Sequence, residues 1–120
     1  MTEARSVLDA GTLSDLRKSV GDDPAFLAEL VDDVLVDGPA LIDALRGAAA
    51  AGDAPAARRA AHTLKGTSRT FGADELAGLC QQAEVAADGG DLEVVLSLLS
   101  PIDDAWSRVS VELRAWRDGR

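Results

Sequence analysis

Residues 54–88 read APAARRAAHTLKGTSRTFGADELAGLCQQAEVAAD, and two helical patterns meet in them at Phe71-Gly72-Ala73. Apolar and small residues recur at spacings of three and four on both sides of this tripeptide, which is typical of helices with one buried face. The stretch therefore predicts a hairpin of two helices, one from an Asp53 cap to about Thr70 and one over about residues 74–88. The expected inward positions are Ala57, Ala60, Ala61, Leu64, Ser68, Leu76, Leu79, Cys80, Ala83 and Ala87.

Two longer helices are predicted on either side of this hairpin. The first opens at Asp23-Pro24, since proline is tolerated in a first turn, and runs to the break at Gly52. The second spans about residues 91–117. Gly38-Pro39 and Pro101 fall inside these helices and predict a kink in each. The buried stripe of the first helix is expected at Leu27, Leu30, Val31, Val34, Leu41 and Leu45.

A short leader helix of about residues 9–20, with Thr12 as its N-cap, precedes these elements. Strand signals are almost absent from the chain. We therefore predict an all-α fold, an antiparallel four-helix bundle over about residues 23–117 with the leader helix packed across one end. A length of 120 residues suits a single core, so residues 1–120 are interpreted as one domain.

The composition excludes several classes of function. A net charge of -9 disfavours nucleic acid and anionic membranes as partners. The single cysteine excludes a disulfide framework and a cysteine-rich metal cage. Neither a signal peptide nor a run of about 18 apolar residues is present, so we expect a cytoplasmic protein without a membrane span.

His62 is the only histidine, and it lies off the buried stripe of its helix, so we expect it to face solvent. The stretch from Arg58 to Arg69 holds four basic residues and no acidic one, although the protein is acidic. Such a patch predicts an anionic ligand, for which Lys65 offers a mobile charge, or else it is only a solvated face of the helix. The helical neighbours of the histidine at i−4, i+3, i+4 and i+7 are Arg58, Lys65, Gly66 and Arg69.

Gly66 stands inside a helix, where glycine costs about 1 kcal/mol relative to alanine. Two interpretations are open. The missing side chain leaves room for a partner or a phosphoryl group beside the imidazole, or it lets a neighbouring helix pack closely.

The predicted hairpin places His62 opposite residues 81–84. Glu84 is a candidate to accept a hydrogen bond from Nδ1, which would leave Nε2 as the free nucleophile. Gln81 is the alternative partner, and a surface carboxylate without any partner is the third possibility.

The motif His62-Thr63-Leu64-Lys65-Gly66, followed by Phe71-Gly72-Ala73 and Leu76, resembles the signature of histidine-containing phosphotransfer (HPt) domains. The resemblance covers roughly residues 8–99. Pro101 departs from the family pattern. The other matching features are the pair Phe26-Leu27, Gly38-Pro39, Gly52-Asp53, Cys80, Glu84 and Gly90-Asp91.

The resemblance implies a phosphocarrier, not an enzyme, in a bacterial two-component phosphorelay. His62 would accept a phosphoryl group on Nε2 from the aspartate of a response-regulator receiver and pass it to another receiver. Lys65 would stabilise this group, Gly66 would keep the approach open, and Glu84 would orient the imidazole. The Mg²⁺ and the catalytic aspartate are expected on the receiver, so the chain itself needs no metal or other cofactor.

The partner surface is expected to centre on His62, with Arg58 and Arg69 contacting the receiver or the phosphoryl group. The preceding helix reverses around Gly52 and brings Leu41 and Ile42 near the histidine. The helical count turns Leu41 inward, so Ile42, or Leu35 about two turns earlier, is the predicted receiver contact. The alternative is that all three are core residues.

Three other classes of function are possible: a phosphoacceptor domain that a chemotaxis-type kinase phosphorylates directly, a helical adaptor that binds receivers without phosphate, and an enzyme. A hybrid histidine kinase is a further expected partner. Enzymatic acyl transfer lacks a visible nucleophile turn, and a di-iron bundle lacks its Glu-x-x-His pairs. We expect a monomer.

Overall fold

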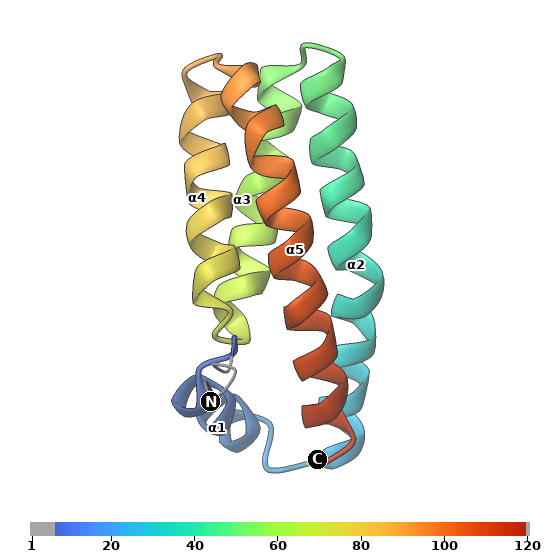
Figure 1. Cartoon of the computed structure of the whole chain (residues 1–120). Coiled ribbons are helices and arrows are strands. Elements are labelled where there is room, and N and C mark those ends of the chain that lie inside the picture. The colour runs from blue at the N-terminus through green and yellow to red at the C-terminus, as the bar shows by residue number, and fades with distance from the viewer. Residues whose placement is uncertain (1–6, 120) are drawn as a thin grey trace, which may run out of the picture.

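The computed structural model describes residues 7–119, and within this range the chain forms five helices and no strand. The helices are α1 Ala10–Ser19, α2 Pro24–Ala50, α3 Ala54–Thr70, α4 Asp74–Asp88 and α5 Leu92–Arg117. The predicted all-helical class is confirmed. Figure 1 shows the four long helices side by side, each running opposite to the one before it, with α1 across the lower end. None of the helices in residues 7–119 has the length and apolarity needed to cross a bilayer.

Aspartates begin four of the five helices in this range. The side chains of Asp9, Asp23, Asp53 and Asp91 accept hydrogen bonds from backbone N–H groups in the first turns of α1, α2, α3 and α5. Such a cap stabilises a helix by about 1 kcal/mol. The prediction that Thr12 caps the leader helix was wrong, because Asp9 takes that role and Thr12 donates to it.

The buried face of α2 passes through Gly38, which is a contact point with α5. A Cβ atom on Gly38 would lie 2.6 Å from the Cζ2 and Cζ3 atoms of Trp106, so only glycine lets the indole ring approach. Both α2 and α5 continue as single helices past Pro39 and Pro101. The buried residues of α2 are Leu27, Val31, Gly38, Ile42, Leu45 and Ala49.

Ile42 is therefore a core residue, only 2% exposed, while Leu41 is half-buried. The prediction that Ile42 contacts a receiver was wrong, and Leu41, which packs against the core, is only partly turned inward. The error arose at Gly38, which lies at the centre of the buried face of α2. Because glycine has no apolar side chain, the hydrophobic pattern did not include this position. Leu35 is half-buried and packs against the core.

α1 is attached to the α3–α4 turn. The backbone N–H of Asp9 donates to the carbonyl of Gly72 at 2.9 Å, and the N–H of Val7 donates to Glu112 Oε2 on α5 at 2.8 Å. Gly72 has φ +70°, and a Cβ there would lie 2.9 Å from the Asp9 nitrogen. The glycine of Phe71-Gly72-Ala73 thus serves both the reversal of the chain and the docking of α1.

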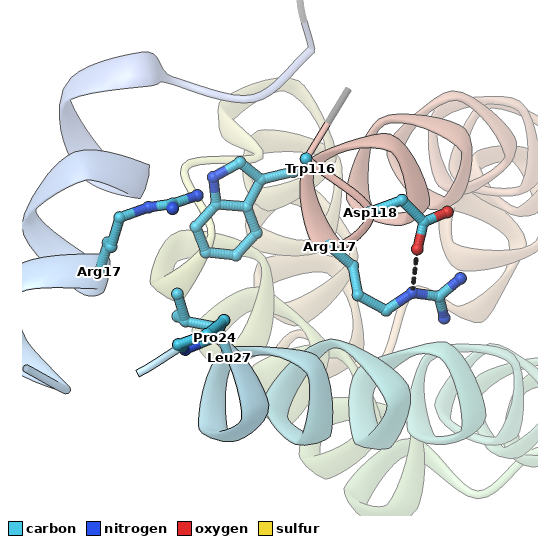
Figure 2. A pocket seen from close by; sticks show the side chains of 7 residues that line it. Arg17, Pro24, Leu27, Trp116, Arg117 and Asp118 are labelled. Carbon is cyan, nitrogen blue, oxygen red and sulfur yellow. Dashed lines mark hydrogen bonds and ion pairs between the residues drawn. The ribbon is translucent and has the colours of Figure 1, made fainter. Parts of the chain in front are cut away.

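A cavity of about 260 Å³ opens between α1, the start of α2 and the end of α5 (Figure 2). The guanidinium of Arg17 lies 5.4 Å from the ring centroid of Trp116 on one side of it. On another side, Arg117 is held by Asp118 and by Asp32. Trp116 also meets Phe71 edge to face at 6.4 Å, so an aromatic and cation–π cluster joins α1 to the long helices.

Candidate functional site

His62 lies near the middle of α3 with 63% of its side chain exposed, which confirms the expectation that it faces solvent. Its helix is well specified, because Asp53 caps the start and the alanine-rich sequence has a strong helix preference. The opposite face of α3 packs into the core through Ala57, Ala61 and Leu64. The imidazole is therefore presented outward from a rigid element.

Glu84 on α4 is the partner of the imidazole, with its Oε2 atom 2.9 Å from His62 Nδ1. An ionised carboxylate can only accept a hydrogen bond, so this contact places the proton on Nδ1. In the neutral imidazole Nε2 then keeps its lone pair and lies on the far side of the ring from the carboxylate. Of the three possibilities considered for this residue, the structure supports an oriented histidine with Glu84 as the orienting group.

Lys65 is held at the same carboxylate and is not the mobile charge that the sequence suggested. Its Nζ atom lies 2.5 Å from Glu84 Oε1 and donates to Gln81 Oε1 at 2.8 Å. Only 12% of the Lys65 side chain is exposed. Gln81 thus contacts the lysine instead of the histidine.

These contacts lower the pKa of the Glu84 carboxyl below its usual value. The hydrogen bond from Lys65 is the main cause, the hydrogen bond from His62 adds to it, and partial burial acts in the opposite direction. Glu84 is therefore ionised throughout the neutral range. Its two oxygens are divided between two donors, Oε1 facing the ammonium and Oε2 facing the imidazole.

Gly66 lies one turn beyond His62 on the exposed face of α3. A Cβ added there meets no atom within 4 Å. The alternative that Gly66 allows close packing of a neighbouring helix was wrong. Open space beside the imidazole is what the missing side chain provides.

The two predicted arginine contacts lie on α3 on either side of His62. Arg58 is half-exposed, and its Nε atom lies 3.9 Å from Asp88 Oδ1 on α4. Arg69 is exposed near the end of the helix. The structure brings neither of them into the bonded group of His62, Lys65, Gln81 and Glu84.

A groove between α2 and α3 was missed by the sequence analysis. It has a volume of about 260 Å³ and is lined by Asp37, Ala40, Leu41, Thr63 and Thr67. Thr63 and Thr67 flank Gly66 on α3, so the groove adjoins the histidine face. The expected reversal around Gly52 indicated that α2 and α3 lie side by side. It did not reveal the groove, because alanine and threonine add little to an apolar pattern.

Other reactive groups are few in the described part of the chain. No three His, Cys, Asp or Glu side chains of residues 7–119 gather in a way that could hold a metal ion. Cys80 is fully buried, and burial raises the pKa of its thiol to about 12. The chemistry of the site is therefore that of an oriented and exposed imidazole.

Comparison with known proteins agrees with this geometry, since the model of the Hpt domain family matches residues 29–114. The chain belongs to the Hpt domain family. The match runs from α2 into α5 and includes every member of the bonded group around His62. The resemblance inferred from the motif is thereby confirmed, and this Hpt domain is a histidine phosphotransfer protein of the phosphorelay type.

The structure of this Hpt domain is similar to the crystal structure of histidine-containing phosphotransfer protein B from Pseudomonas aeruginosa PAO1. The two chains are 30% identical with a TM-score of 0.86, and the similarity covers 98% of this chain and 99% of the other. No curated protein sequence matches this Hpt domain.

Proposed function

We propose that this Hpt domain accepts a phosphoryl group on His62 Nε2 from the aspartyl phosphate of one receiver and transfers it to the aspartate of another. The observation that carries the proposal is the bond between Glu84 and Nδ1, which leaves Nε2 as an exposed nucleophile. Gly66 leaves space beside it for an approaching phosphoryl group. A helical adaptor that never carried phosphate would have no use for an imidazole oriented in this way.

The transfer step follows from this geometry. The Nε2 lone pair attacks phosphorus, the bond between phosphorus and the aspartyl oxygen breaks, and that oxygen leaves as the carboxylate of the receiver. The imidazole gains a positive charge while Nδ1 keeps its proton, and the ionised Glu84 offsets that charge. Onward transfer is the reverse step with a second receiver, so the domain is a covalent carrier and not a catalyst of net turnover.

The receiver supplies the remaining chemistry in this proposal. Mg²⁺ and the phosphorylated aspartate belong to the receiver, and this domain carries no cofactor. Arg58 and Arg69 flank His62 on the exposed face of α3, where they can contact the phosphoryl group or the acidic pocket of a receiver.

The groove between α2 and α3 is the proposed apolar docking site for a receiver. Leu41 is half-buried in this groove next to Thr63, in the place that the sequence analysis assigned to Ile42. Leu35 is half-buried on α2 about two turns before Ile42, and it remains the second candidate for a receiver contact. The antiparallel bundle serves here as a rigid support, and we expect a monomer acting in a bacterial cytoplasm, with neither nucleic acid nor membrane as its partner.

The test is acid-labile phosphorylation by phosphorylated receivers and Mg²⁺, read by mass spectrometry at neutral pH. We expect one phosphoryl group on the wild type and none on His62→Gln. The variant should keep its thermal unfolding transition, because the side chain is largely exposed.

The other outcomes contradict the proposal in different ways. Phosphate on both proteins would remove His62 from the mechanism. If a histidine kinase ATP-binding domain transferred a phosphoryl group to His62 and no receiver did, the phosphoryl donor would be a kinase and not a receiver.

A further inference from the structure

Four side chains from α3 and α4 form one continuous chain of polar contacts. Gln81 Oε1 accepts from Lys65 Nζ at 2.8 Å, the ammonium lies 2.5 Å from Glu84 Oε1, and Glu84 Oε2 lies 2.9 Å from His62 Nδ1. Gln81 and His62 thus stand at the two ends of this series of contacts, and none of these contacts joins them directly.

Lys65 is linked to the Nδ1 side of the imidazole through the Glu84 carboxylate. Nδ1 and Nε2 lie on opposite sides of the ring, and the ammonium of Lys65 is bound to the carboxylate that faces Nδ1. The phosphoryl group forms on Nε2. In the unphosphorylated protein Lys65 therefore acts on the histidine through Glu84.

Gln81 is the residue that keeps the ammonium in this place. Lysine has donors only, so a side chain with 12% exposure needs acceptors from the protein. The amide oxygen of Gln81 accepts a hydrogen bond from the ammonium, and Glu84 Oε1 is the ion-pair partner of the ammonium. Without Gln81 the ammonium keeps only the ion pair with Glu84 and gains freedom to turn toward solvent.

We propose that Gln81 is a positioning residue, which holds Lys65 on Glu84 Oε1 so that Glu84 presents Oε2 to His62 Nδ1. The inference rests on the proposed function of His62. In this arrangement Gln81 controls the tautomer and the orientation of the His62 imidazole before phosphorylation. Loss of a hydrogen bond to a charged group of this kind is expected to change a rate by about tenfold.

The first test is the tautomer of His62 in the unphosphorylated protein, measured from the ¹⁵N shifts of the imidazole. Gln82 is an exposed neighbour of Gln81 on α4 and provides a matched control. Wild type and Gln82→Leu should show the Nδ1-protonated tautomer alone. Gln81→Leu and Gln81→Ala should show a mixture with the Nε2-protonated form, and an unchanged tautomer in both would overturn the proposal.

The second test is a double-mutant cycle in the rate of phosphoryl transfer. Gln81→Leu should slow transfer about tenfold in the wild-type background and have no further effect when Lys65→Met is already present. An equal slowing in both backgrounds would show that Gln81 does not act through Lys65 and would overturn the proposal. The ¹⁵N measurement needs no phosphate, so a failure of His62 to accept phosphate would be distinguished from a failure of this inference.

Discussion

Gly38 on α2 and Gly66 on α3 both interrupt the interior of a helix, but their surroundings are opposite. Gly38 is buried beneath the indole of Trp106, where a Cβ would overlap the ring. Gly66 is exposed beside His62, and a Cβ there would meet nothing. Each glycine weakens its helix by about 1 kcal/mol relative to alanine, and the first makes room for α5 while the second makes room for something outside the chain.

The region around Gly38 serves packing, and the region around Gly66 serves function. The region around Gly38 is apolar and gains its stability from contact between α2 and α5. The region around Gly66 is polar, with an exposed imidazole held by Glu84. Substitutions in the first region should therefore change stability, and those in the second should change transfer.

The largest expected effect comes from Gly38→Leu. The added side chain must displace Trp106, which should lower the free energy of unfolding by about 3 kcal/mol. Transfer by the molecules that remain folded should be unchanged, because the substitution is remote from the bonded group around His62. Urea denaturation measures the free energy of unfolding, and a variant as stable as the wild type would show that Gly38 is not needed for the contact with Trp106.

Cys80 offers an independent readout of the same variant. Burial raises the pKa of its thiol to about 12, so the native protein should react very slowly with a thiol reagent. The labelling rate should rise in Gly38→Leu and stay at or below the wild-type value in Gly66→Leu.

The second largest effect is expected from Gly66→Leu, which should change stability in the opposite direction. Leucine is a better helix former than glycine, so stability should rise by up to about 1 kcal/mol. The side chain would occupy the space beside the imidazole and slow transfer from a receiver by at least about tenfold. Gly66→Ala is the graded control, with a similar gain in stability and a smaller loss of transfer, and wild-type transfer by Gly66→Leu would remove the access role.

The smallest effect concerns the pH dependence of stability at Glu84. Its folded-state pKa is lowered below 4.5 by Lys65 and His62, so the ionised carboxylate favours the folded state above that pH. This contribution is lost as the pH falls through the lowered folded pKa. Because the group is partly exposed, it should amount to less than about 1 kcal/mol.

Chemical denaturation of wild type and Glu84→Gln between pH 3 and 7 measures this contribution. The difference in stability between the two proteins should shrink as the pH falls. A difference that grows on acidification would mean that Glu84 is not held as a carboxylate in the folded protein.

The helical hairpin of α3 and α4 was predicted well, and the middle of α2 was not. A single short turn at Gly72 sets the register of the hairpin, so residues 81–84 could be placed opposite His62 by counting residues. In α2 the buried face passes through Gly38, which carries no apolar side chain, and Ile42 was consequently assigned to the wrong face. The motif around His62 also identified the Hpt family from the sequence, because its residues are close together along the chain.

The helices, the Asp53 cap, the exposed position of His62 and the family could all be predicted from the sequence. These features depend on interactions between residues a few positions apart, which the helical period makes readable. The contact of Glu84 with His62 Nδ1, the contact of Gln81 with Lys65 and the opposite roles of Gly38 and Gly66 became visible only in the packed bundle. Those outcomes depend on the rotation and spacing of packed helices, where a shift of one residue changes which side chains meet.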